Sequence, residues 1–160
     1  MDAQQVTLRK MTSAEYEAAT EHRESESVRV LSKLIPEELA WERVRRGTAR
    51  FLPDGPDTAD HHLLAAENEA GEVVGYAWIG PNPNQVSGIA TTALLYDINV
   101  FALFRRRGYG SGILAAAEEL VAREGMTALT LNVVGDNEAA IALYRHNGYE
   151  VTAMSMRKNL

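Results

Sequence analysis

The sequence predicts one mixed α/β domain, and three observations support this fold class. A length of 160 residues fits a single domain, and a hydrophobic content of 46% is enough to build a sizeable core. Short runs rich in β-branched residues alternate with longer stretches that have helical periodicity. In the second half of the chain, a glycine-rich turn joins an apolar strand to an amphipathic helix.

Caps, chain breakers and apolar patterns place the elements in order. A threonine or serine with a glutamate nearby marks a helix start, whereas clusters of proline, glycine and aspartate mark loops. In the first half we expect a strand at 6–11, a helix capped by Thr12 or Ser13 with Glu15 in its first turn, a helical stretch at about 27–47 broken at Pro36, a loop at 52–60, and strands at 62–67 and 73–79 that form a hairpin through 68–72. In the second half we expect a loop at 81–87, a strand at 90–100, a helix at 113–123, a strand at 129–134, a helix that begins near Asn137 and ends at Gly148, and a last strand at 149–156.

The glycine-rich turn has the sequence R-R-R-G-Y-G-S-G, from Arg105 to Gly112. A turn that opens a helix presents unpaired backbone N–H groups and the positive end of the helix dipole. Glycine permits positive φ and close approach of an anion to the backbone, and the arginines add charge. We therefore expect a phosphate or pyrophosphate at this junction. A Walker loop and a dinucleotide fingerprint do not match the spacing. The alternative is an ordinary helix start with surface arginines.

A second motif lies on the helix that follows residues 129–134. Asn137, Ala140 and Tyr144 are three and seven residues apart, so they share one helix face. Asn137 stands at the helix start, where its short amide can cap the helix or meet a ligand. The alternative for Tyr144 is an amphipathic position with a packed ring and a solvated hydroxyl.

Taken together, these motifs resemble the GNAT superfamily of acyl-CoA-dependent N-acyltransferases. The resemblance rests on D-I-N-V from Asp97, R-x-x-G-x-G from Arg105, N-x-x-A-x-x-L-Y from Asn137, and the closing G-Y-x₆-M-R-K-N-L from Gly148. Order and spacing agree with the family over residues 90–160, whereas the first half agrees only in its run of elements. Ala102 is a departure, because relatives often carry proline there. The resemblance implies a GNAT-like fold, with a central, mostly antiparallel mixed sheet, two splayed parallel strands and flanking helices.

The resemblance also implies acetyl-CoA as co-substrate, without a metal. In the family, backbone amides of the R-x-x-G-x-G turn hold the pyrophosphate of coenzyme A, and the preceding strand pairs with its pantetheine arm. Backbone N–H groups at the end of that strand are expected to stabilise the oxyanion. Carried onto this chain, the predicted cofactor-binding residues are Ile98, Asn99, Val100, Arg105, Arg106, Arg107, Gly108, Tyr109, Gly110, Ser111, Gly112, Asn137 and, as a weaker candidate, Asn132.

In the implied reaction a neutral amine attacks the thioester, and two residues are predicted to act in it. Tyr144 matches the tyrosine placed near the thiolate and is the candidate general acid. Asp97 is the candidate general base, directly or through water, although it could instead orient backbone or bind a cationic substrate. Leu94 stands near the position where some members carry a glutamate, so deprotonation by water alone stays open. His61 and His62 could line the acceptor cleft and rank behind Asp97.

Composition excludes several other classes of protein. A net charge of −6 argues against general nucleic-acid binding. There is no apolar run of membrane-spanning length and no secretory pattern at the N-terminus, so we expect no membrane partner and a cytoplasmic location. The absence of cysteine excludes disulfides, zinc–thiolate sites and a cysteine acyl-enzyme. Direct transfer between two bound substrates is therefore favoured.

The sequence thus predicts transfer of an acetyl group from acetyl-CoA to an amine on a small molecule or a peptide. Two hypotheses from other classes remain. One is a catalytically silent module that binds coenzyme A as a sensor or partner. The other is a nucleotide-binding regulatory domain. The identity of the acceptor and the oligomeric state, a homodimer included, stay open.

Overall fold

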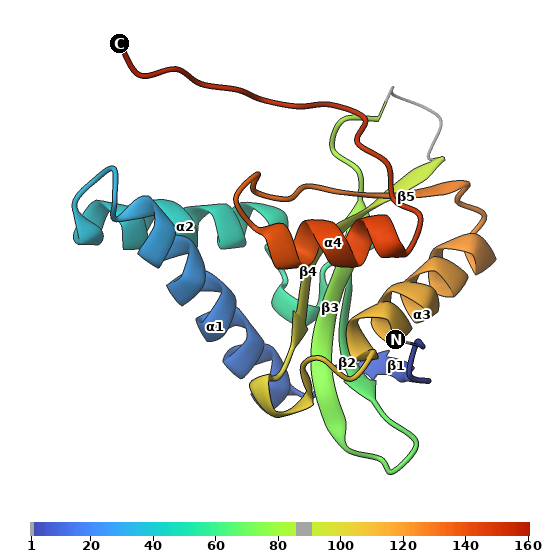
Figure 1. The fold of residues 1–160 in the computed structure, drawn as a ribbon. Helices are drawn as coiled ribbons and strands as arrows, with labels where there is room; N and C mark the ends of the chain where they lie inside the picture. Colours follow the sequence, from blue (N-terminus) through green and yellow to red (C-terminus); the bar gives the residue numbers. More distant parts are fainter. Residues whose placement is uncertain (1, 86–90) are drawn as a thin grey trace.

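A computed structural model describes residues 2–85 and 91–160 and shows a five-stranded sheet flanked by helices (Figure 1). The strand order is β1-β2-β3-β4-β5; the first four strands pair antiparallel, and β4 pairs parallel with β5. The elements are β1 (Thr7–Lys10), α1 (Ser13–Leu31), α2 (Glu37–Phe51), a 3₁₀ turn (Gly55–Asp57), β2 (His62–Glu67), β3 (Val73–Pro81), β4 (Thr92–Val100), a second 3₁₀ turn (Ala102–Phe104), α3 (Tyr109–Arg123), β5 (Ala128–Leu131) and α4 (Glu138–His146). This arrangement confirms the predicted mixed α/β fold.

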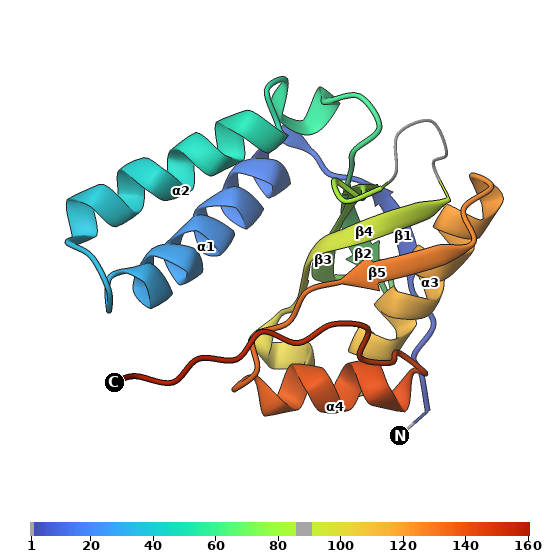
Figure 2. The ribbon, with the colours of Figure 1, turned by 90° about the horizontal axis from the view of Figure 1, so that it is seen from above.

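Alternating side chains of the strands form two hydrophobic cores, one on each face of the sheet. Leu63 and Trp78 pack on the face covered by α1 and the end of α2. Leu64 packs on the opposite face, against Ile113 and Leu114 of α3, both of which are fully buried. Figure 2 shows the result from above, with α1 and α2 together on one side and α3 and α4 on the other.

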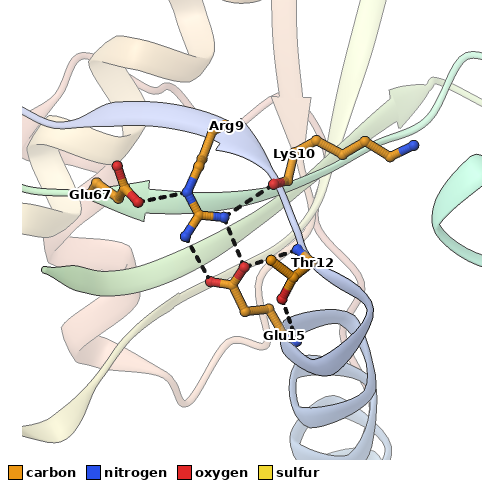
Figure 3. Close-up of polar contacts among 5 residues, drawn as sticks. All are labelled: Arg9, Lys10, Thr12, Glu15 and Glu67. Carbon is orange, nitrogen blue, oxygen red and sulfur yellow. Dashed lines mark hydrogen bonds and ion pairs between the residues drawn. The ribbon is translucent and has the colours of Figure 1, made fainter. Parts of the chain in front are cut away.

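The start of α1 is fixed by a capping box, and of the two expected caps, Thr12 and Ser13, the structure has Thr12. Thr12 Oγ1 accepts a hydrogen bond from the Glu15 amide at 3.2 Å, and Glu15 Oε1 accepts one from the Thr12 amide at 2.9 Å. Arg9 of β1 donates to both carboxylate oxygens of Glu15, at 2.8 and 3.1 Å, and to Glu67 of β2 at 2.6 Å (Figure 3). The hydrogen bonds from Arg9 lower the pKa of Glu15 from 4.5 to about 2. One guanidinium therefore ties α1 to two strands.

A bulge in β4 changes which side chains face α1. Trp78 pairs with Asp97, whereas Ile79 pairs with Leu95, so Tyr96 is an extra residue on β4. The bulge interrupts the alternation along the strand and leaves Tyr96 on the same face as Trp78, where the two rings stack with centroids 4.5 Å apart. Bulges of this kind often lie next to functional sites.

Several predicted boundaries differ from the structure: the helix expected at 113–123 begins at Tyr109, the helical stretch expected to end at about 47 continues to Phe51, and two further differences have clear reasons. The helical stretch expected at 27–47 is divided, because residues 27–31 end α1 and α2 begins only at Glu37. The break at Pro36 is confirmed, since this residue caps α2 and proline disfavours a helical residue before it. The strand expected at 129–134 ends at Leu131, because β4 and β5 pair over four residues and then separate.

The prediction of a strand at 149–156 is wrong. Residues 150–160 form no regular structure and are exposed along their whole length. A strand pattern needs a neighbouring strand to pair with, and this segment instead runs away from the sheet (Figure 1). The predictions for residues 86, 87 and 90 lie outside the described residues. No helix in the described part of the chain is long and apolar enough to cross a membrane.

Candidate functional site

The separation of β4 from β5 leaves part of β4 without a neighbour on that side. The last pair is Leu95 with Leu131, so the residues that follow on β4 keep β3 as their partner and have an open edge toward β5. The predicted strand residues Ile98, Asn99 and Val100 all lie in this stretch. Main-chain groups at such an edge can accept an extended ligand as an additional strand.

Asp97 lies at the start of the open stretch, directly after the bulge. Its side chain is partly buried, and burial raises the pKa of Asp97 above its ordinary 3.8. Arg23 and His22 on α1, and the amide of Ile98, act in the opposite direction. Because the pKa is raised overall, this carboxylate is a stronger base than one in water.

Helix α4 brings Tyr144 toward the same place. Asn137 caps this helix, and its Oδ1 accepts a hydrogen bond from the Ala140 amide at 3.2 Å, which confirms the capping role considered for it. The Tyr144 ring packs edge-on against Tyr149 with centroids 5.9 Å apart. Burial raises the pKa of Tyr144, and the negative charge of Asp97 raises it further. The Tyr144 hydroxyl therefore stays protonated at neutral pH and lies within electrostatic reach of the Asp97 carboxylate.

The turn between β4 and α3 has the irregular backbone that its glycines predict. Gly108 has a φ of 89°, and Arg106 has a φ of 62° although it carries a side chain. A non-glycine residue in this region costs about 1 kcal/mol or more, and such strain is common at ligand sites. The Gly112 amide donates to the Gly108 carbonyl at 3.1 Å and begins the hydrogen bonding of α3. The amides just before Gly112 stand at the helix N-terminus, where a helix offers them no acceptor.

The three arginines of the turn are all exposed, but they make different contacts. Arg105 Nε donates to the Val100 carbonyl at 2.9 Å and ties the turn to the end of β4. The Arg107 guanidinium lies 5.9 Å from the centroid of the Phe104 ring. Arg105 therefore stabilises the fold of the turn through this hydrogen bond, in addition to contributing a positive charge.

The glycines of the turn allow other segments of the chain to pack closely against it. A Cβ at Gly108 or Gly112 would collide with main-chain oxygens of the N-terminal segment, which runs beside the start of α3. A Cβ at Gly110 would lie 3.0 Å from the Leu143 side chain of α4. Positive φ at Gly108 is confirmed. Packing against these segments is therefore one reason for glycine at these positions, and the approach of an anion to the backbone stays a prediction.

The other predicted residues near the turn are placed by side-chain contacts. Ser111 is buried, and its hydroxyl accepts a hydrogen bond from Asn147 Nδ2 at 2.9 Å. The Tyr109 hydroxyl accepts one from Asn68 Nδ2 at 3.4 Å. Asn132 is exposed directly after the last residue of β5. The first two contacts hold the turn against the end of α4 and the β2–β3 hairpin. Asn132 directly follows Leu131, the last residue of β5 that pairs with β4.

A pocket between α1, α2 and the sheet is the part of the site that the motifs did not predict. The Arg23 guanidinium lies 4.6 Å from the centroid of a Trp78 ring, and Trp78 stacks on Tyr96. Phe51 meets the Tyr96 ring edge-on, with centroids 5.6 Å apart. Glu24 is also engaged within the protein, since its Oε2 accepts a hydrogen bond from Thr48 Oγ1 at 2.8 Å. The remaining lining residues are Ser27, Val44 and Gly47.

Sequence reasoning missed Arg23, Tyr96 and Asn147 because no local signal marks them. Arg23 is one charge in a highly charged helix, and only the tertiary packing of α1 brings it over Trp78. Tyr96 lines the pocket because of the bulge in β4, and no sequence pattern predicts this bulge.

The histidines ranked behind Asp97 have structural partners. His61 Nδ1 accepts a hydrogen bond from Trp78 Nε1 at 2.9 Å, and burial lowers the pKa of His61. His62 Nε2 lies 2.7 Å from Glu124 Oε1. Within residues 2–85 and 91–160, no group of three or more His, Asp or Glu side chains is placed to hold a metal ion.

Comparison with known proteins relates this arrangement to a family. The model of the acetyltransferase (GNAT) family matches residues 17–149. The chain is 28% identical to YdgE of Bacillus subtilis, described as an uncharacterized N-acetyltransferase, over 96% of this chain and 98% of YdgE. It is 31% identical to YycN, described in the same way and from the same organism, over 69% of each. The solved structure of YycN aligns with a TM-score of 0.86 and 26% identity, over 97% of this chain and 98% of YycN. Mycothiol acetyltransferase of Clavibacter michiganensis is 32% identical over 59% of this chain and 29% of that longer protein.

Proposed function

Because the chain belongs to the GNAT family of N-acetyltransferases, we propose that it acetylates an amine by direct attack on acetyl-CoA within a ternary complex. The observation that carries the proposal is the open edge that β4 has after it separates from β5, with Asp97 on that stretch and Tyr144 of α4 packed against the same hydrophobic core as Ile98 and Val100. Asp97 and Tyr144 come from different elements, and the charge of one acts on the pKa of the other. The sequence has no cysteine that could carry the acetyl group, which supports direct transfer.

We assign the acetyl-CoA site to the open edge of β4 and the turn that follows it. Main-chain groups of Ile98 and Val100 face the open edge and suit an extended arm, as an added strand would use them, whereas the carbonyl of Asn99 faces β3. The amides at the start of α3, together with the exposed arginines of the turn, suit a diphosphate. Asn137 can contribute its amide nitrogen, which the helix cap does not use, and Asn132 directly follows the last residue of β5 that pairs with β4.

We assign the acceptor amine to the pocket between α1, α2 and the sheet. It lies on the face of the sheet that carries the Trp78–Tyr96 stack, and Arg23 links it electrostatically to Asp97. Aromatic walls with a few charged groups are typical of small-molecule sites. The name of the mycothiol acetyltransferase relative also supports a small-molecule acceptor.

In the proposed mechanism, Asp97 accepts the proton of the amine as the bond from nitrogen to the acetyl carbon forms. Tyr144 donates its phenolic proton to the sulfur as the carbon–sulfur bond breaks, so free coenzyme A leaves as the thiol. A main-chain amide of the open edge stabilises the oxyanion. The Phe101 amide is not that donor, because it already donates to the Val74 carbonyl at 2.9 Å.

The test is release of free thiol from acetyl-CoA across a panel of amines, combined with calorimetric titration of coenzyme A. We expect turnover with at least one amine, and we expect Asp97→Asn to lower kcat by about 10²-fold or more while the Kd for coenzyme A changes little. Asp54→Asn, at an exposed aspartate in the loop after α2, is the matched control. Tight binding of coenzyme A without turnover on any amine would favour the silent binding module. Stronger binding of ATP or NAD would favour a nucleotide-binding domain.

A further inference from the structure

Arg23 differs from the other groups that line the acceptor pocket, because its charge has no ion-pair partner in the described part of the chain. The ion pairs found among the described residues do not include it. Its guanidinium carbon lies 4.6 Å from the centroid of a Trp78 ring, and its Nη2 donates a long hydrogen bond of 3.4 Å to Thr20 Oγ1. The ring attracts the charge of the guanidinium, so most of the N–H donors of Arg23 remain for another partner.

The position of Arg23 makes an unpaired charge costly. The side chain is half-buried, and burial lowers the pKa of Arg23 because it removes water from the charged form. Asp97, Tyr16 and Glu24 act in the opposite direction. A cation that has lost part of its hydration is stabilised when an anion accepts hydrogen bonds from it. The pocket wall therefore carries a cation that suits an anionic ligand.

Most other polar groups of the pocket wall are engaged within the protein. Trp78 Nε1 donates to a histidine nitrogen at 2.9 Å, and the Tyr96 hydroxyl donates to a main-chain carbonyl at 2.6 Å. Thr48 Oγ1 donates to Glu24 Oε2 at 2.8 Å, which directs this carboxylate toward α2. Arg23 is therefore the strongest hydrogen-bond donor that the wall offers to a bound molecule.

We propose that the acceptor is a small amine that also carries an acidic group, with the anion bound by Arg23 and the amine directed toward Asp97. This inference rests on the acetyl transfer proposed above. Asp97 directly follows Tyr96 on β4, and the charges of Arg23 and Asp97 act on each other, so one molecule with both groups can span the two side chains. The cavity of about 260 Å³ suits a small molecule, and its aromatic wall covers the apolar part. Carboxylate and phosphate share the required chemistry, because a guanidinium binds either of them through two parallel hydrogen bonds.

Matched pairs of amines test the inference, because the members of a pair differ mainly in the acid. Each standard amino acid and β-alanine is compared with its carboxamide, and phosphoethanolamine with ethanolamine, by release of free thiol from acetyl-CoA. We expect at least one acid to have a kcat/KM about tenfold or more above that of its neutral counterpart, and Arg23→Gln to remove that preference. The carboxylate pairs and the phosphate pair show which anion is bound. Neutral amines or spermidine that react as well as the acids, or a preference that survives in Arg23→Gln, overturn the proposal.

Two further variants separate the charge of Arg23 from its part in the fold. Arg23→Lys keeps the positive charge without the planar fork of donors, so it should retain part of the preference for the acid. Arg29→Gln removes an exposed charge from the same helix and should retain all of it. Circular dichroism checks that each variant is folded. A loss of preference in Arg29→Gln as large as that in Arg23→Gln would overturn the assignment to Arg23.

Binding of product analogues tests the anion site without any reaction. N-acetyl amino acids and their carboxamides have no reactive amine and differ in charge. The chain has two tryptophans, so Trp41→Phe leaves Trp78 as the single tryptophan, and its fluorescence reports on the pocket. We expect at least one acid to bind about tenfold or more tightly than its carboxamide, and Arg23→Gln in this background to abolish the difference. Equal binding of acid and carboxamide, or no binding of either, overturns the proposal.

The two measurements also distinguish this inference from the reaction on which it rests. Binding of the acids that depends on Arg23, without turnover on any amine, would contradict the proposed reaction and leave the anion site in place. Turnover of neutral amines that does not depend on Arg23 would support the reaction and overturn the inference.

Discussion

Glu15→Gln is the substitution whose effect on stability follows most directly from the structure. Glutamine keeps the shape of the side chain and can still accept the Thr12 amide, but it removes the charge that two nitrogens of Arg9 bind. The fall in the pKa of Glu15 from 4.5 to about 2 corresponds to about 3 kcal/mol, at about 1.4 kcal/mol for each pH unit. Partial exposure of both side chains to solvent reduces this to about 1–2 kcal/mol of unfolding free energy at pH 7.

The pH dependence gives this prediction its sharpest test. A carboxylate with a lowered pKa in the folded state stabilises the fold above the unfolded value of 4.5 and loses that effect as the pH falls toward 2. Urea unfolding, followed by circular dichroism between pH 7 and pH 2, should therefore show a difference between wild type and Glu15→Gln that is constant down to about pH 5 and then shrinks. Glu17→Gln, at an exposed glutamate on the same helix, should show little loss. A loss for Glu15→Gln that does not depend on pH would refute the electrostatic origin of the stabilisation.

Three further substitutions test the site and its support. Tyr144→Phe should lower kcat by about 10²-fold with little change in the Kd for coenzyme A, because it removes only the proposed proton donor. Arg23→Gln should move the acid limb of the pH profile of kcat/KM to higher pH, because Arg23 lowers the pKa of Asp97 and its removal lets that pKa rise. Gly112→Ala should lower the unfolding free energy by about 1–3 kcal/mol, because its Cβ would collide with the Gln4 carbonyl.

Each of these substitutions has a matched control in the chain. Tyr16→Phe removes the hydroxyl of a half-buried tyrosine on α1 and should keep kcat near that of wild type. Arg29→Gln removes an exposed charge from the same helix as Arg23 and should leave the pH profile in place. Gly47→Ala lies in helix α2 with no atom within 4 Å of its added Cβ, so it should be neutral or slightly stabilising. Equal effects of a substitution and its control would argue against the assigned role.

The sequence predicted the elements whose signals are local. The helix start at Thr12 or Ser13, the β2–β3 hairpin and the cap at Asn137 depend on residues close together in the chain, and the structure confirms all three. The prediction of a last strand at 149–156 was wrong because a strand-like sequence pattern does not specify a neighbouring strand with which the segment would pair. The bulge at Tyr96 was missed because it arises from the register between β3 and β4.

The two halves of the proposed site also differ in how far the sequence predicts them, because one consists mainly of main-chain groups and the other of side chains. The half that we assign to coenzyme A depends on the open edge of β4 and the amides of the turn, and a short motif with fixed spacing marks the residues that form both. The glycines of that motif are required by packing against the N-terminal segment and α4. The motif therefore indicates the fold around the turn as well as the expected ligand.

The acceptor half is built differently, and this bears on how the enzyme selects its substrate. Its walls include the side chains of Arg23, Trp78 and Tyr96, which α1, β3 and the bulge in β4 bring together from distant parts of the sequence. Changes in these side chains alter the shape and charge of the pocket without touching the main-chain groups assigned to acetyl-CoA. Arg23 is the exception, because its charge acts on the pKa of Asp97 as well as on the pocket. A change at Arg23 should therefore shift acceptor selectivity and the pH profile together, whereas a change at Phe51, on the pocket rim, should shift selectivity alone.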